Sequence, residues 1–196
     1  MKFPKALLPI TALCTVALVS AVSIAGQDPG KGGKAVDAGM PKPTITAEHG
    51  MLKKLVGTWD ANVTCNGPEG PMNSKGTATY KAIGDTWVAS DFTGKMMGMP
   101  FTGHGVEGFD PSKKKFISTW CDSMSTALMV MEGTHDASTN STTLTGECPD
   151  PMTGKMVKHR MVTKMGDANS MTFHMYAPGP DGKEAEMMTI EYKRRK

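Results

Sequence analysis

Branched aliphatic residues are scarce in most of this chain. Beyond residue 25 it has only four leucines and four isoleucines, and aromatic residues make up 6% of the whole sequence. Methionine is the abundant apolar residue instead, with 18 copies. Because methionine is unbranched and flexible, it fills irregular space and is common at permissive binding surfaces. The composition therefore predicts an apolar interior lined largely by methionine.

The sequence also lacks the short motifs that mark several common catalytic sites. It contains no Gly-x-Ser-x-Gly, no His-Glu-x-x-His and no phosphate-binding loop. An enzymatic alternative depends on Asp122 or His159, as an acid or a base that faces the interior of the fold. We therefore assign no catalytic residue from the sequence.

A strong excess of basic residues is missing as well. The formal charge is +3, and removal of residues 1–25 would take away Lys2 and Lys5 and lower it to +1. A protein that binds nucleic acid needs a basic face. The near-neutral charge therefore argues against nucleic acid as a partner.

The first 25 residues have the pattern of a cleavable signal peptide. Lys2 and Lys5 precede an apolar run over 6–24, and Ser23-Ile24-Ala25 is a small-x-small cleavage site. An uncleaved membrane anchor is the alternative, because a run of this length could nearly span a bilayer. Residues 26–45 are rich in glycine, lysine and proline and predict a disordered linker. We expect a secreted or periplasmic protein with no membrane span after cleavage.

Three cysteines follow the signal: Cys65, Cys121 and Cys148. Export permits a disulfide, but an odd number leaves at least one thiol unpaired. Cys65 and Cys148 share parity with apolar neighbours in their strands, so one pairing across the interior stays open. No Cys-x-x-Cys pair is present, and we expect no zinc site.

The remaining residues, 46–196, predict one short helix followed by strands. Apolar residues in 47–56 recur on one helical face, with Thr46 as a plausible N-cap and Gly57 as the stop. From Trp59 to Cys65 the apolar residues alternate with polar ones, which indicates a strand with one buried face. Turn signals then divide the chain into about ten strands, spaced as in an all-β sandwich or barrel. Sequential hairpins favour an antiparallel up-and-down barrel.

Several motifs in order resemble the DUF1579 family of bacterial proteins of unknown function. They are Leu55-x-Gly57-Thr58-Trp59, Met96-Met97-Gly98-Met99-Pro100-Phe101, Ser118-Thr119-Trp120, the Asp150–Lys155 turn and the Pro178–Lys183 turn. The Gly-x-Trp element after a short helix also resembles the lipocalin/calycin superfamily. That resemblance implies a lipocalin-like barrel closed by a cation over the tryptophan, for which Arg194 is the preferred residue.

The alternation of side chains then suggests an interior pocket for a small apolar or amphipathic ligand, with a small lipophilic molecule as the expected partner. The residues predicted to line this pocket are Trp59, Val63, Trp120, Met129, Met131, His159 and Met161. A barrel with a filled core that binds a partner by its outer surface is the alternative. The oligomeric state is left open.

Metal and haem binding are the less favoured interpretations, and we predict no cofactor. Met96, Met97 and Met99 with His104 nearby form the best candidate for Cu(I), because thioethers suit that ion. His159 loosely resembles the single haem-binding histidine of nitrobindin-like barrels. The other histidines that bear on the site, His49 and His135, are expected at the surface or in loops.

Overall fold

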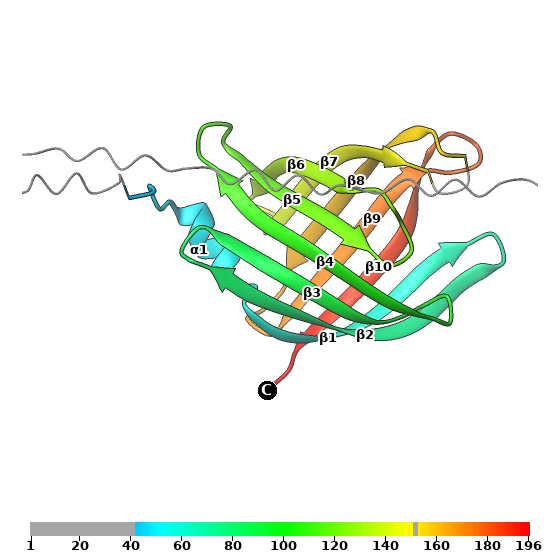
Figure 1. Cartoon of the computed structure of the whole chain (residues 1–196), viewed down its shortest axis with the longest axis horizontal. Helices are drawn as coiled ribbons and strands as arrows, with labels where there is room; N and C mark the ends of the chain where they lie inside the picture. Colours follow the sequence, from blue (N-terminus) through cyan, green and yellow to red (C-terminus); the bar gives the residue numbers. More distant parts are fainter. Residues whose placement is uncertain (1–41, 151–152) are drawn as a thin grey trace, which may run out of the picture. The chain divides into compact units, whose positions relative to one another are not determined.

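The computed structural model describes residues 42–150 and 153–196, in which one short helix precedes ten strands that close into a barrel (Figure 1). The predicted signal peptide, and the predicted linker up to residue 41, lie outside the described residues. In the described part of the chain no helix is long and apolar enough to cross a bilayer. The elements are α1 (Ala47–Lys53), β1 (Gly57–Gly67), β2 (Gly70–Ile83), β3 (Trp87–Met96), β4 (Met99–Asp110), β5 (Lys115–Asp122), β6 (Met129–Asp136), β7 (Ser141–Pro149), β8 (Met156–Met165), β9 (Ser170–Pro178) and β10 (Glu184–Arg194).

Each strand pairs antiparallel with its neighbours in sequence, and β1 pairs with β10 to close the barrel. This order confirms the predicted up-and-down barrel. The turns β1–β2, β3–β4, β5–β6 and β9–β10, together with the end of β7 and the start of β8, all lie at one end, which we call the distal end. The helix leads into the start of β1 and packs on β3 and β4 at the opposite end, which we call the α1 end (Figure 1).

Side chains alternate between the interior and the outside along β1, as the sequence pattern predicts. Trp59, Ala61 and Val63 are at most 2% exposed, whereas Asp60 and Asn62 are exposed. Residues paired directly across two strands point to the same side of the sheet. Starting from the inward residues of β1, the register of the ten pairings therefore identifies the inward residues of every other strand.

The helix begins as predicted, with Thr46 as its N-cap, but His49 is not a surface residue. His49 is 2% exposed, its Nδ1 accepts a hydrogen bond from the Thr46 backbone N–H at 3.0 Å, and its ring meets the Phe109 ring edge-on. The prediction was wrong because His49 lies on the face of α1 that covers the barrel. Leu52 on the same face packs with Val88 and Phe116.

Arg194 lies over Trp59, as the lipocalin-like resemblance implied. The guanidinium carbon is 4.0 Å from the centre of the indole ring. Its nitrogens donate hydrogen bonds to the carbonyl oxygens of Val56, Lys54 and Ala168 at 2.6, 2.6 and 3.0 Å. One side chain thus joins the last strand to the segment before β1 and to the β8–β9 turn.

One loop, which the glycine and proline residues of 66–71 predict, is shorter than expected because strand pairing continues into it. The predicted loop 66–71 is a two-residue turn, with Gly67 paired to Gly70. Pro71 is tolerated in β2 because β2 pairs with β3 only from Gly76 onward, so no ladder on that side needs its missing N–H.

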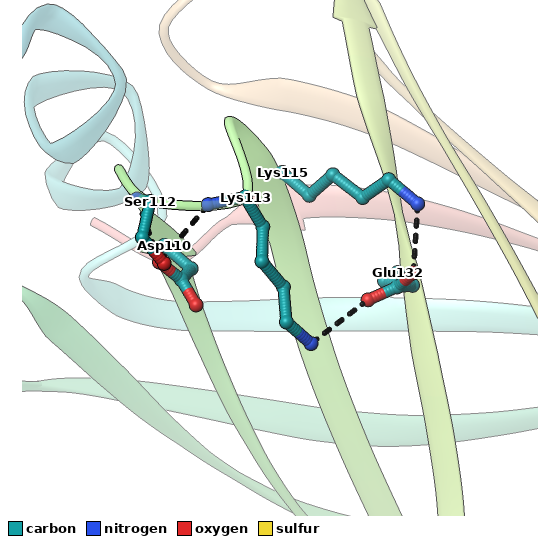
Figure 2. A network of polar contacts seen from close by, with 5 residues as sticks. All are labelled: Asp110, Ser112, Lys113, Lys115 and Glu132. Carbon is teal, nitrogen blue, oxygen red and sulfur yellow. Dashed lines mark hydrogen bonds and ion pairs between the residues drawn. The ribbon is translucent and has the colours of Figure 1, made fainter.

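Pro111 at the second position of Asp110-Pro111-Ser112-Lys113 predicts a type I turn, which forms and is tied to β6 on the outer surface (Figure 2). The Asp110 carboxylate accepts hydrogen bonds from the backbone N–H groups of Ser112 and Lys113 at 2.8 and 3.3 Å. The Lys113 and Lys115 ammonium groups then contact the two oxygens of Glu132 at 3.3 and 2.7 Å. This network fixes the β4–β5 hairpin against β6 at the α1 end.

Candidate functional site

A cavity of about 330 Å³ lies in the barrel interior. Its volume falls at the lower end of the range for small-molecule pockets, roughly 300–1,000 Å³. The helix contributes Met51 and Leu52 to its wall, and Leu55 is added by the segment between α1 and β1, so the cavity is covered from the α1 end. The described lining residues include nine methionines, in agreement with the predicted Met-lined interior: Met51, Met96, Met129, Met131, Met161, Met165, Met171, Met175 and Met188.

The other part of the interior, along β1, is filled. Trp59, Ala61 and Val63 pack with Ile190 and Tyr192 of β10 in one buried cluster. None of the described residues of β1 lines the cavity. The cavity is therefore bordered by residues of β2 to β10, and the described residues of β1 do not reach it.

Four of the seven predicted pocket residues lie on the cavity wall: Trp120, Met129, Met131 and Met161. Trp59 and Val63 point inward but belong to the filled cluster along β1. His159 also has the inward parity, opposite Gly146 of β7, yet it is not among the lining residues. Whether any of these residues binds a ligand stays a prediction.

Trp120 can lie flat along the wall because its neighbours on β4 have no side chains. A Cβ atom at Gly103 would lie 2.1 Å from the Trp120 ring, and one at Gly105 would lie 3.1 Å from it. The indole N–H donates a hydrogen bond to Asp122 Oδ2 at 3.0 Å. The Gly103-x-Gly105-x-x-Gly108 spacing lies inside strand β4 and accommodates tryptophans, rather than opening a helix as in dinucleotide-binding folds.

His159 contacts a cysteine and does not line the cavity. Its Nδ1 lies 2.9 Å from Cys148 Sγ and 3.1 Å from the Val157 carbonyl oxygen, and the side chain is buried. Burial raises the pKa of the Cys148 thiol. This packing leaves His159 outside the wall that a haem in the cavity would contact.

The candidate copper residues do not point the same way. Met96 is buried with its sulfur 3.2 Å from Cys65 Sγ, whereas Met97 and Met99 are about half exposed, at 52% and 49%. His104 lies on the outer face, where its Nδ1 contacts Asp91 at 2.8 Å. Among the described residues, no group of three or more histidine, cysteine, aspartate or glutamate side chains is placed to hold a metal ion.

The enzymatic alternative required an acid and a base within reach of each other. Asp122 is on the cavity wall, where it accepts hydrogen bonds from the Trp120 indole and the Met124 backbone N–H. Among the hydrogen bonds of the described residues, none joins Asp122 to His159. The two groups occupy different strands and have different partners.

The three cysteines of the barrel are free thiols in different surroundings. Cys65 is half-buried, Cys148 is buried and Cys121 is exposed. Cys65 and Cys148 therefore do not form a disulfide with each other. The Cys65 thiol contacts Met96, and the Cys148 thiol contacts His159.

Sequence reasoning missed the polar groups of the cavity wall, and Glu107 above all. Glu107 pairs with Val88 of β3 and with Ser118 of β5, which places it on the inward face. Ser90 donates a hydrogen bond to Glu107 Oε1 at 3.2 Å, while Oε2 is buried with no hydrogen-bond partner. Burial raises the pKa of Glu107 to about 7. Its parity with Phe101 and Phe109 on β4 was the signal that could have identified it.

Two tyrosines and a histidine also belong to the polar part of the wall. Burial raises the pKa of the Tyr80 and Tyr192 phenols, and the Glu107 charge contributes to both shifts. His135 was expected at the surface, but it lines the cavity, with its Nδ1 3.1 Å from the Thr142 hydroxyl. That prediction was wrong because His135 continues the inward alternation of Met131 to the end of β6.

Comparisons with known proteins agree with this architecture. The DUF1579 family, described as a protein of unknown function, matches residues 44–194. Among curated proteins none matches this sequence. The crystal structure of Rv2717c from M. tuberculosis is similar, with a TM-score of 0.61 and 12% identity over 78% of this chain and 100% of that one. The S-type phycobiliprotein lyase CPES from Guillardia theta has a TM-score of 0.52 and 9% identity over 79% of this chain and 99% of that one. At these identities the likeness shows the fold alone.

Proposed function

The chain belongs to the DUF1579 family, and we propose that it binds a small apolar or amphipathic molecule inside its barrel. The observation that carries this proposal is the cavity of about 330 Å³ with its Met-rich wall. Affinity would come mainly from removing apolar ligand surface from water, at roughly 25 cal/mol per Å². Flexible methionine side chains can adjust to the shape of such a molecule.

The wall is apolar with a few polar groups, which is the usual composition of a small-molecule site. Phe92, Phe173 and Leu144 add apolar surface between the methionines. Ser90, Glu107 and Asp122 place polar atoms at separate points of the wall. A bound molecule would be held by its apolar body and oriented by these groups.

Native mass spectrometry of the protein purified from its own host tests the proposal, beside a denatured control. We expect a mass excess that disappears on denaturation. An unliganded mass, together with no thermal shift across a panel of lipophilic compounds, would overturn ligand binding.

A cavity-filling variant tests whether the ligand binds in the cavity. Thr163 lines the cavity, so Thr163→Phe should occupy part of it and weaken binding while the barrel stays folded. Thr172→Phe is the matched control, because Thr172 pairs with Lys164 and Glu191 on the outer face. Equal loss of binding in both variants would place the ligand elsewhere.

We also propose that the protein is exported, on the basis of the signal-like pattern in residues 1–25. Fractionation of the host followed by N-terminal sequencing tests this. We expect an envelope or extracellular protein that begins at Gly26. A cytosolic protein that retains Met1 would overturn export.

Binding through the outer surface is the second candidate, and apolar side chains at the distal end favour it. Met97 and Met99 in the β3–β4 hairpin, Leu128 before β6 and Met156 at the start of β8 are between 49% and 61% exposed. Flotation of the protein with lipid vesicles tests this candidate. If the double variant Met97→Ser and Met99→Ser releases the protein from vesicles but retains the interior ligand, the two activities are separate.

A further inference from the structure

One carboxylate oxygen on the cavity wall is buried without a partner. Glu107 Oε2 has no hydrogen-bond partner among the described residues, while Oε1 accepts one from the Ser90 hydroxyl at 3.2 Å. A buried acceptor without a donor costs free energy, and a charged one costs more. Such an atom on the wall of a cavity is suited to accept a hydrogen bond from whatever occupies that cavity.

The charges of the wall have one sign. Its acids are Glu107 and Asp122, and its described lining residues include no lysine or arginine. Asp122 is already used by the Trp120 indole and the Met124 N–H. His135, the remaining titratable side chain besides the tyrosines, contacts the Thr142 hydroxyl. Glu107 is therefore the acid with an acceptor atom left for a ligand.

We propose that the cavity selects molecules that carry one protonated amino group on an apolar body, and that this ammonium group donates a hydrogen bond to Glu107 Oε2. The inference rests on the proposed interior ligand site and names its ligand class. A cation satisfies the unpartnered oxygen and also neutralises the buried charge, which a neutral hydroxyl cannot do. The methionine and aromatic side chains would surround the apolar body.

Binding of such a cation depends on whether Glu107 is ionised, and therefore on the groups that surround its carboxylate. Ser90 of β3 and Ser118 of β5 are its polar neighbours, and His104 on its own strand favours the charged form. The charge of Glu107 raises the pKa of Tyr80 of β2 and of Tyr192 of β10. At the α1 end the cavity wall is apolar, with Leu52 of α1 and Leu55 of the segment that follows it. Because burial raises the pKa of Glu107 to about 7, ammonium binding should strengthen as pH rises through that value.

The test is isothermal titration calorimetry of the purified chain with three ligands of one chain length: octylammonium, octanol and octanoate. We expect octylammonium to bind at least about tenfold more tightly than octanol, and octanoate to bind most weakly. Glu107→Gln should reduce octylammonium affinity about tenfold and leave octanol unchanged. Glu191→Gln is the matched control, since Glu191 is exposed and pairs with Asn62 on the outer face of β1.

A pH series gives a second readout that does not require the variant to fold. From pH 6 to pH 8 the affinity of the wild-type protein for octylammonium should rise about tenfold, while its affinity for octanol stays constant. Octanol binding as tight as octylammonium binding at both pH values would overturn the amine inference and leave ligand binding intact. Failure of all three ligands, with no bound molecule in native mass spectrometry, would overturn both.

Discussion

Arg194 stacks its guanidinium group 4.0 Å from the centre of the Trp59 ring, and the two residues come from opposite ends of the barrel sequence. The indole N–H donates a hydrogen bond to the Leu55 carbonyl at 2.8 Å, so the ring is itself held by the segment that leaves α1. Trp59 is fully buried. The pair fastens the first strand, the last strand and the helix connection at the α1 end.

Arg194→Lys should therefore destabilise the barrel by about 2 kcal/mol, because an ammonium group cannot make the forked hydrogen bonds of a guanidinium group. Urea unfolding followed by tryptophan fluorescence measures the change. Arg195→Lys is the control, because Arg195 is exposed and forms a surface ion pair with Asp60. Equal effects of the two substitutions would show that the position over Trp59 has no special role.

Gly103→Ala should destabilise the protein by about 1–3 kcal/mol, because the new methyl group would overlap the Trp120 ring. The additional change Trp120→Leu should recover part of this loss. Gly50→Ala in α1 is the contrasting variant, because nothing lies within 4 Å of a Cβ atom there. It should stabilise the protein by about 0.5–1 kcal/mol through helix propensity. Thermal unfolding of the three variants decides whether crowding at Trp120 is the cause.

The raised pKa of Glu107 makes a prediction for the stability of the unliganded protein. The pKa of Glu107 rises from 4.5 to about 7 on folding, so the folded state binds the proton more tightly than the unfolded state. This contribution to stability is complete below about pH 4.5, is lost as pH rises through 7, and changes no further above that value.

The glutamine side chain of the Glu107→Gln variant does not ionise, so the variant does not lose stability in this way. The difference in unfolding free energy in favour of the variant should therefore grow as pH rises from 5 to 7, approaching roughly 3 kcal/mol. Chemical unfolding at a series of pH values measures the difference between the two proteins. Other carboxylates contribute equally to both and cancel. A difference that stays constant with pH would show that Glu107 titrates normally.

Thiol labelling distinguishes the three cysteine environments. In the folded protein we expect fast reaction of Cys121 alone, because Cys121 is exposed and burial raises the pKa of the Cys65 and Cys148 thiols. Denaturation should expose all three thiols of the chain cleaved after Ala25. Recovery of a single thiol after denaturation without reductant would instead reveal a disulfide.

Much of the fold could be read from local patterns in the sequence. Alternation of apolar and polar residues located the strands, and turn residues separated them into hairpins. The errors in boundaries arose where pairing continued through residues that also suit loops, as at Pro71. His49 and His135 were misplaced because a lone polar residue at a buried position has no distinctive local pattern.

The candidate site was predicted less completely, and the reason is geometric. Parity correctly turned Trp59, Val63 and Trp120 inward, yet only Trp120 of these three borders the cavity. Parity states which side of a sheet a side chain faces, but not whether the space in front of it is filled. That depends on the volumes of side chains from strands far apart in the sequence.

The sequence by itself determined the number and order of the strands, the Met-rich interior and the arginine that covers Trp59, because each follows from local alternation, composition or a recognisable motif. Only the tertiary structure decided that the inward residues of β1 are packed over, while residues of the other nine strands border a cavity. It also decided that Glu107 Oε2 is buried on the wall without a partner. Both depend on the packing of side chains from many strands around one enclosed space, which no single segment of the chain specifies.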